Sequence, residues 1–132
     1  MGTPPLILLA DDNPDDQSFI RDAFSYVNAN VQLKMFDSGT ELLHHLEIVK
    51  DEHLPALIVL DYNMPSQNGG EILKLLIKKG RYDTIPKIML STSYYKAHID
   101  RCLQIGATGY LIKPDNLFSW QQIALTMLEY IK

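Results

Sequence analysis

The sequence contains a single cysteine, Cys102, and it has neither a long apolar run nor an excess of basic charge. One cysteine excludes an internal disulfide and a thiolate metal site, and its neighbours Ile99, Leu103 and Ile105 predict that it is buried. A formal net charge of -4 provides no basic face for nucleic acid. The lack of a long apolar segment and of a charged, then apolar N-terminus argues against membrane insertion and export. We therefore expect a cytoplasmic protein that binds neither nucleic acid nor membranes.

Apolar residues are nevertheless plentiful, at 46% of the chain. A chain of 132 residues has the length of one ordinary domain, and this apolar share supplies a core for it. The sequence therefore predicts a single domain that spans residues 1–132.

Short apolar runs alternate along the chain with segments of helical periodicity. Four of the runs end on a polar residue, and they occupy residues 6–10 before Asp11, 56–60 before Asp61, 87–90 before Ser91 and 110–112 before Lys113. A fifth run, at residues 31–35, alternates apolar and polar side chains as a strand with one wet face does. Because a stripe of helical spacing follows each run, the pattern predicts five strand–helix units.

The starts of three helices are also marked in the sequence. Asn13-Pro14 is typical of a helix cap followed by proline in the first turn. Residues 38–41 have the spacing of a capping box, and Gly69-Gly70 leads into the next apolar stripe.

Strands that alternate with helices predict an α/β fold, in which a parallel sheet is covered by helices on both faces. The half-wet run at residues 31–35 belongs at an edge, which favours the strand order 2-1-3-4-5 of a flavodoxin-like, doubly wound (βα)5 sheet. In this order the first and third strands are neighbours. Their carboxyl ends would bring Asp11, Asp12 and Asp61 together where such sheets bind ligands.

Three carboxylates in one partly buried cluster need a cation. At about 5 Å apart they repel by roughly 3 kcal/mol per pair at an effective dielectric constant of about 20. Mg²⁺ fits best, because it prefers oxygen ligands and usually combines one or two carboxylates with phosphate oxygens. Zn²⁺ would require histidine or thiolate, and the adjacent His44 and His45 are expected to point in different directions, toward solvent. With Ser91 and Lys113 at nearby strand ends, the cluster suits a phosphoryl group with an aspartate as its acceptor.

Together these motifs resemble the receiver domain of two-component response regulators. The similarity spans the chain and rests on five segments in order, which are Asp11-Asp12-Asn13, Asp61-Tyr62-Asn63-Met64-Pro65 with Gly69, Ser91-Thr92, Gly106-Ala107, and Tyr110 through Lys113-Pro114. Each segment alone has an ordinary structural explanation, such as a helix cap, a turn or a surface lysine. Their joint occurrence at four strand ends makes coincidence a poor explanation.

The resemblance implies a phosphorylation-activated signalling switch that is not an enzyme beyond its own phosphorylation and dephosphorylation. It implies that Asp61 is the phosphoacceptor and also a Mg²⁺ ligand. Asp12 would be the direct carboxylate ligand, the backbone carbonyl of Asn63 a further ligand, and Asp11 a ligand mainly through water.

The resemblance also assigns roles to the residues around the acceptor. Lys113 would pair with the acceptor and then with the phosphoryl group. Ser91 would move to hydrogen-bond the phosphoryl group, and Tyr110 would report that movement. In this family the bond corresponding to Lys113-Pro114 is cis, so a cis peptide bond is expected here.

Two positions depart from the family pattern. Ser91 stands where threonine is more common, so it lacks the methyl group that restricts its rotamer. Thr92 stands where a very small residue is usual, and we expect its branched side chain to narrow access to Asp61. Gly109 is consistent either with a close backbone approach at the start of the last strand or with a plain turn.

The implied partners are a sensor histidine kinase or a histidine phosphotransfer protein. Signalling is expected through the face formed by the fourth strand, the fourth helix, the fifth strand and the fifth helix. A homodimer through the fourth helix, fifth strand and fifth helix, or an effector, would bind there. This output face is predicted around Lys96, His98, Arg101, Tyr110 and Trp120. The adjacent Tyr94 and Tyr95 suit either an interface or packing onto the sheet. Met1 favours a complete stand-alone regulator, and residues 13–16 with 91–93 resemble regulators paired with phytochrome-like sensor kinases.

Other functions fit the residues less well. A flavin-binding module would need amides and hydroxyls after the first strand, where the acids at 11 and 12 would repel a phosphate. A phosphatase of the haloacid dehalogenase type would need an acid two residues after its nucleophile, where Asn63 stands. A P-loop enzyme would need a GxxxxGK segment, which is missing. A non-phosphorylated, receiver-like adaptor would predict a damaged site, yet every charged position is intact.

Overall fold

The computed structural model describes residues 3–64 and 67–131, so Pro65 of the Asp61 motif lies outside the described residues. Strands and helices alternate along the chain. In order they are β1 (Leu6–Ala10), α1 (Pro14–Tyr26), β2 (Gln32–Phe36), α2 (Gly39–Ile48), β3 (Leu57–Asp61), α3 (Gly69–Lys78), β4 (Lys87–Ser91), α4 (Lys96–Ile105), β5 (Gly109–Ile112) and α5 (Leu117–Glu129), with a short 3-10 helix at Asp51–His53.

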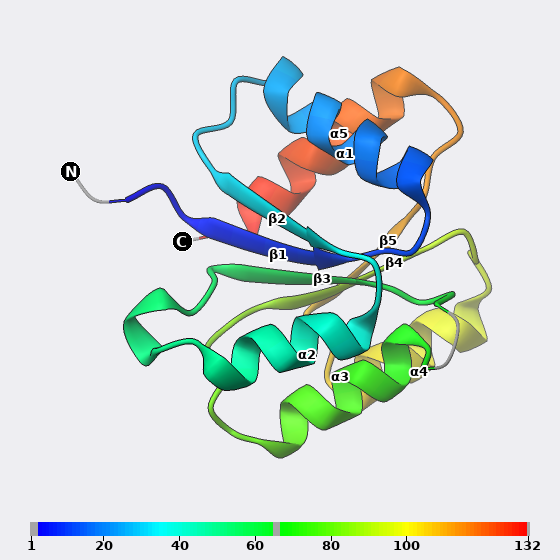
Figure 1. Ribbon diagram of the computed structural model, residues 1–132. Coiled ribbons are helices and arrows are strands. Elements are labelled where there is room, and N and C mark those ends of the chain that lie inside the picture. Colours follow the sequence, from blue (N-terminus) through cyan, green and yellow to red (C-terminus); the bar gives the residue numbers. More distant parts are fainter. Residues whose placement is uncertain (1–2, 65–66, 132) are drawn as a thin grey trace.

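The five strands form one parallel sheet in the order β2-β1-β3-β4-β5. Helices α1 and α5 cover one face, and α2, α3 and α4 cover the other (Figure 1). The predicted α/β class, (βα)5 repeat and strand order are confirmed. Since β1 and β3 are neighbours, the ends of these two strands meet at one edge of the sheet.

The burial of each strand follows its position in the sheet. Every residue of β3 and β4 is buried, as is most of β1, because these central strands are covered by helices on both faces. In β2 the side chains of Gln32 and Lys34 are exposed, whereas Leu33, Met35 and Phe36 are partly buried. The half-wet strand therefore lies at the edge, as predicted. Cys102 is buried, also as predicted.

Two helix starts that bear on the functional edge are capped by side chains. The Asn13 side chain accepts hydrogen bonds from the backbone N–H groups of Asp15 and Asp16, at 2.9 and 3.2 Å, and Pro14 opens α1. Ser38 caps α2 through the N–H of Glu41. The reciprocal half of that predicted capping box is wrong, because the Glu41 carboxylate accepts from the N–H of Asp37 instead of Ser38.

Three local expectations differ from the structure. His45 is only partly exposed, with its ring 5.3 Å from that of Phe36, because its position on α2 turns it toward β2, whereas His44 is exposed as expected. Trp120 is 3% exposed and therefore does not belong to the output surface, because α5 turns Trp120, Ala124 and Met127 inward at helical spacing.

The expected cis bond before Pro114 is also wrong. Within residues 3–64 and 67–131 no peptide bond is cis. The trans form is the more stable one even before proline, by about 0.5–1 kcal/mol. The same part of the chain contains no helix that is long and apolar enough to cross a membrane.

Gly109 makes a close approach rather than a turn. It is the first residue of β5, and a Cβ atom there would overlap the Tyr130 hydroxyl. Gly69 makes a similar approach beside the Asp61 strand end. A Cβ at Gly69 would lie 2.6 Å from the backbone carbonyl oxygen of Asp61 and 3.0 Å from the Cα of Tyr62. Backbone atoms cannot yield there as a flexible side chain can, so position 69 requires glycine.

We expect Gly69→Ala to lower the free energy of unfolding by about 2 kcal/mol, because overpacking against fixed backbone atoms destabilises a core by about 1–3 kcal/mol. Gly70→Ala is the matched control, since it lies at the same helix start and the nearest atom to its Cβ would be the side-chain oxygen of Asn68, at 3.2 Å, rather than a backbone atom. Urea denaturation of both variants measures the difference. Equal stability of the two variants would contradict the close approach.

Candidate functional site

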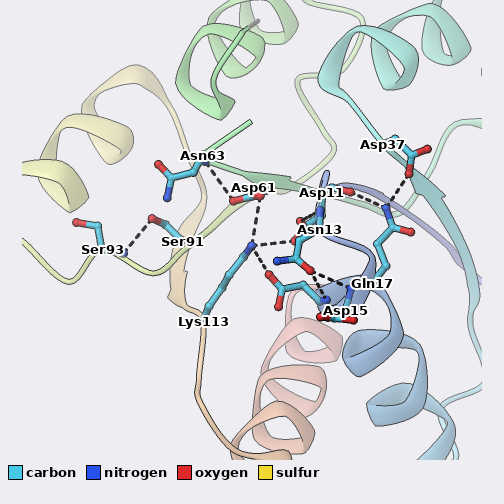
Figure 2. A network of polar contacts seen from close by, with 11 residues as sticks. Asp11, Asn13, Asp15, Gln17, Asp37, Asp61, Asn63, Ser91, Ser93 and Lys113 are labelled. Atoms are coloured by element: carbon cyan, nitrogen blue, oxygen red, sulfur yellow. Dashed lines mark hydrogen bonds and ion pairs between the residues drawn. The ribbon is translucent and has the colours of Figure 1, made fainter. Parts of the chain in front are cut away.

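Four strand ends deliver the predicted site residues to one edge of the sheet. Asp11 follows β1, Asp61 ends β3, Ser91 ends β4, and Lys113 follows β5. Figure 2 shows the Lys113 side chain pointing at Asp11 and Asp61, with Ser91 and Asn63 on the other side of Asp61. The carboxylates of Asp11 and Asp61 are buried, at 0% and 2% exposed.

The three acids predicted to hold a metal lie together. Asp11, Asp12 and Asp61 each offer a carboxylate oxygen within 4.8 Å of the others, and Asp12 is the exposed member. One oxygen of each buried acid accepts a backbone N–H group: Asp11 from Asn13 at 2.9 Å, and Asp61 from Asn63 at 3.1 Å. The second carboxylate oxygen of each of these two acids faces the Lys113 ammonium.

The carboxylate oxygens of this cluster suit a divalent cation. The buried Oδ2 atom of Asp11 accepts no hydrogen bond from any described residue, and its contact is the charge of Lys113 at 3.0 Å. A buried carboxylate oxygen without a hydrogen bond is costly unless a cation compensates it. An all-oxygen cluster with one exposed acid also leaves room for waters, which Mg²⁺ retains. The residues therefore fit Mg²⁺.

Lys113 lies within ion-pair distance of three carboxylates. Its Nζ atom is 3.0 Å from Asp11, 3.2 Å from Asp61 and 2.7 Å from Asp16, and the lysine side chain is 8% exposed. The sequence predicted the pairing with Asp61 but not the contacts with Asp11 and Asp16. Asp16 lies on the first turn of α1, far from Lys113 in sequence, and the signal for it was its place three residues after the capping Asn13.

The acids and the lysine shift each other's ionisation. Burial raises the pKa of Asp61, the nearby charge of Asp11 raises it further, and Lys113 and the N–H of Asn63 lower it, with a net value of about 7. Burial lowers the pKa of Lys113, but the hydrogen bond from Lys113 to Asp16 and the charges of Asp11 and Asp61 outweigh burial and raise it overall. The lysine is therefore a permanent cation, whereas Asp61 is only partly ionised near pH 7.

Asp12 and Asp61 open onto a cleft of roughly 600 Å³. It is lined by Asp12, Asn13, Pro14, Asp15, Asp16, Asp61, Asn63, Thr92 and Lys113. Thr92 is exposed and lines this cleft together with Asp61, and the narrowing of access expected from its branched side chain stays a prediction.

Two of the three predicted switch residues, Ser91 and Tyr110, meet at Ser93, which the sequence marks only as part of the loop after the fourth strand. Ser91 is buried, and its hydroxyl accepts the backbone N–H of Ser93 at 3.1 Å. The Tyr110 hydroxyl donates to the backbone carbonyl of the same Ser93 at 2.8 Å. The Ser93 side chain also lies 2.9 Å from Nδ1 of His98, whose ring packs on Tyr62. One loop residue therefore joins the β4 end, β5 and α4.

Gln17 is a second residue that sequence reasoning missed. Its side-chain amide donates to the backbone carbonyl of Asp11 and to the carboxylate of Asp37, so the first turn of α1 is tied to the ends of β1 and β2. An amide one turn into a helix gives no sequence signal of such a contact. It fixes the helix that carries Asp16.

Comparison with known proteins identifies relatives over most of the chain. Residues 7–122 match the family model of the response regulator receiver domain. Two-component response regulator ORR11 of Oryza sativa subsp. japonica is 31% identical over 113 residues, which cover 86% of this chain and 74% of that protein.

Solved structures agree with the family match. The phosphorylated cyanobacterial phytochrome response regulator RcpA has a TM-score of 0.86 and 26% identity, covering 97% of this chain and 94% of its own. RPA3017, a response regulator in red light signalling of R. palustris, has a TM-score of 0.84 and 26% identity, covering 96% and 92%. The Mn²⁺-bound form of Rcp1 shares the fold at a TM-score of 0.84 and 24% identity, with 98% of each chain covered.

The raised pKa of Asp61 predicts how stability depends on pH without divalent cations. Because the folded protein holds this proton more tightly than the unfolded chain, folding is favoured while Asp61 is protonated. That contribution falls as pH rises from about 4 to about 7. We expect Asp61→Asn to be more stable than the unchanged protein at pH 8, by about 2 kcal/mol, and to show a much smaller difference at pH 4.

Urea denaturation in EDTA at both pH values measures this difference. Asp22→Asn, an exposed acid on α1, is the control and should change stability little at either pH. An Asp61→Asn variant that is less stable than the unchanged protein at pH 8 would contradict the raised pKa.

Proposed function

The chain belongs to the family of response regulator receiver domains, and we propose that it is a two-component signalling switch. Asp61 would accept the phosphoryl group from a phosphohistidine of the partner protein. One observation carries the proposal. Asp61 is a buried carboxylate beside the Lys113 ammonium, in a cluster with Asp11 and Asp12, and it lines the open cleft. The nucleophile Asp61, the Lys113 ammonium and the carboxylate oxygens proposed to bind a metal ion thus lie together at one cleft.

The metal set that we propose for Mg²⁺ comprises Asp12, Asp61 and the backbone carbonyl of Asn63, with Asp11 acting through water. The Asp cluster supports it, as does the buried Oδ2 atom of Asp11, which accepts no hydrogen bond from a described residue. When bound, the ion would supply positive charge to the phosphoryl oxygens during transfer.

Asp61 is the group that changes covalently. One of its carboxylate oxygens forms a bond to phosphorus while the P–N bond of the phosphohistidine breaks, and the released imidazole nitrogen takes up a proton. The product is an acyl phosphate on Asp61. Lys113 offers its ammonium to the phosphoryl oxygens, and transfer of this kind depends on positioning and charge more than on acid–base groups. The chain then catalyses only its own phosphorylation and dephosphorylation, and is otherwise no enzyme.

The alternatives of an adaptor without phosphorylation and of a haloacid dehalogenase type phosphatase are less well supported. An adaptor does not need a buried acid with a strongly shifted pKa beside a lysine. The phosphatase needs a second acid two residues after its nucleophile, and Asn63 occupies this place with its N–H bonded to Asp61.

We propose that Ser91 and Tyr110 change their hydrogen bonds when Asp61 is phosphorylated. A phosphoryl group adds close to two negative charges and strong acceptors beside Ser91. If the Ser91 side chain rotates so that its hydroxyl donates to the phosphoryl group, its oxygen moves away from the N–H group of Ser93, from which it now accepts. The loop carrying Ser93 also holds the Tyr110 hydroxyl, so both contacts change together.

The proposed output face consists of α4, β5 and α5. Large apolar side chains are exposed there, namely Leu103 on α4, Ile112 on β5, and Leu117, Phe118 and Leu125 on α5, and the stacked Tyr94 and Tyr95 lie exposed just before α4. Such side chains suit a homodimer or an effector. A sensor histidine kinase or a histidine phosphotransfer protein would be the phosphodonor in the cytoplasm. The likeness to the cyanobacterial phytochrome response regulator RcpA supports a phytochrome-type kinase.

Incubation with acetyl phosphate and Mg²⁺ tests the proposal. Intact-mass spectrometry should show the added mass of one phosphoryl group, which is lost with EDTA and in Asp61→Asn. Asp22→Asn serves as the control and should be phosphorylated normally. Phosphorylation that persists in Asp61→Asn, or none in the unchanged protein, would contradict the assignment.

Thr92 is expected to slow both formation and hydrolysis of the acyl phosphate, because its side chain stands at the cleft in front of Asp61. Thr92→Ala should raise both rate constants about threefold or more, which corresponds to about 0.6 kcal/mol in each barrier. Quenched time courses with acetyl phosphate measure the two rates. Thr84→Ala, an exposed threonine at the opposite edge of the sheet, is the control. Unchanged rates in Thr92→Ala would show that Thr92 does not restrict access.

A further inference from the structure

Asp16 makes the shortest contact of the Lys113 ammonium, yet it stands outside the cluster of three acids that faces the cation. An ammonium has three N–H donors, and three carboxylates surround this one. Asp16 therefore takes one donor away from Asp11 and Asp61.

The position of Asp16 is fixed by its own surroundings. Its backbone N–H donates to the capping side chain of Asn13, and Pro14 opens the same turn. The next residue, Gln17, binds the turn to Asp11 and to Asp37. A carboxylate in the first turn of a helix is also favoured by the helix dipole. Asp16 is thus a rigid anchor, whereas lysine has a flexible four-carbon stem.

We infer that Asp16 is a positioning residue that holds the Lys113 ammonium at the rim of the acid cluster, so that Asp11 and Asp61 stay available to a divalent cation. This inference rests on the proposed function of the site. Without Asp16 the flexible lysine turns its free donor to the buried pair and competes with the cation for the same oxygens. Of the residues that line the cleft, Lys113 is the only lysine or arginine, so its placement decides this competition.

Two simpler explanations make different predictions. If Asp16 attracts the cation only through its charge, any acid at the cleft has the same effect. Asp15 provides this comparison, because it is the next residue on the same turn, lines the same cleft, and forms no ion pair with a described residue. If Asp16 matters only for folding, metal affinity stays unchanged once the variant is folded.

The experiment is a calorimetric titration with MgCl2 at pH 8 and constant ionic strength, on Asp16→Asn, Asp15→Asn and Asp16→Glu. We expect Asp16→Asn to raise the Kd for Mg²⁺ about tenfold, in the range that removal of a supporting group around a metal site typically costs. Asp15→Asn should change it by less than about twofold, and Asp16→Glu should restore part of the affinity. Circular dichroism spectra establish that each variant is folded.

The same pair of measurements in a Lys113→Gln background isolates the mechanism. There Asp16→Asn should leave the Kd nearly unchanged, because no ammonium remains to be held. An equal effect of Asp16→Asn and Asp15→Asn, or the same loss with and without Lys113, would overturn the inference. If the unchanged protein binds no Mg²⁺ at all, the proposed function fails and this inference with it.

Discussion

The ion pairing of the Lys113 ammonium with Asp11, Asp16 and Asp61 is the interaction on which the carboxyl edge of the sheet depends. Two buried carboxylates lie at neighbouring strand ends, because the parallel order brings β1 beside β3. Such a pair repels by roughly 3 kcal/mol at 5 Å and an effective dielectric constant of about 20. Leaving a buried charge without its partner typically costs about 3–5 kcal/mol, so this lysine stabilises the edge.

One ammonium does not balance the acids around it. The pKa of Asp61 stays raised to about 7 although Lys113 lies 3.2 Å away, because burial and Asp11 act against it. The same deficit of positive charge explains why the cluster suits a divalent cation and why a new anionic group would redistribute its contacts. The raised pKa of Asp61 and the fit of the cluster to a divalent cation therefore have the same electrostatic cause.

The sequence predicted the parts of this arrangement that follow from local patterns and topology. Apolar runs that end in Asp11, Asp61, Ser91 and Lys113 fixed the strand ends, and the half-wet run fixed the edge strand. The sequence could not predict which contacts the long and rotatable side chains make. The contact of Lys113 with Asp16 joins residues 97 positions apart, and it depends on how α1 is capped and tilted.

The wrong expectations have the same kind of origin. The inward turns of Trp120 and His45 depend on how α5 and α2 rotate against the sheet, and rotation of a helix is set by packing. The trans bond at Pro114 shows that a feature carried over from a family need not hold in each chain. Conversely, the hub at Ser93 arises from three contacts that no spacing in the sequence encodes.

The most direct measurement is a crystal structure of the protein with Mg²⁺ and beryllofluoride, which mimics an acyl phosphate. We expect beryllium on a carboxylate oxygen of Asp61, and the metal ion on Asp12, Asp61 and the Asn63 carbonyl. The Lys113 ammonium should contact a fluoride and keep its ion pair with Asp16. Beryllofluoride at another acid, or a Lys113 side chain turned away from the adduct, would contradict it.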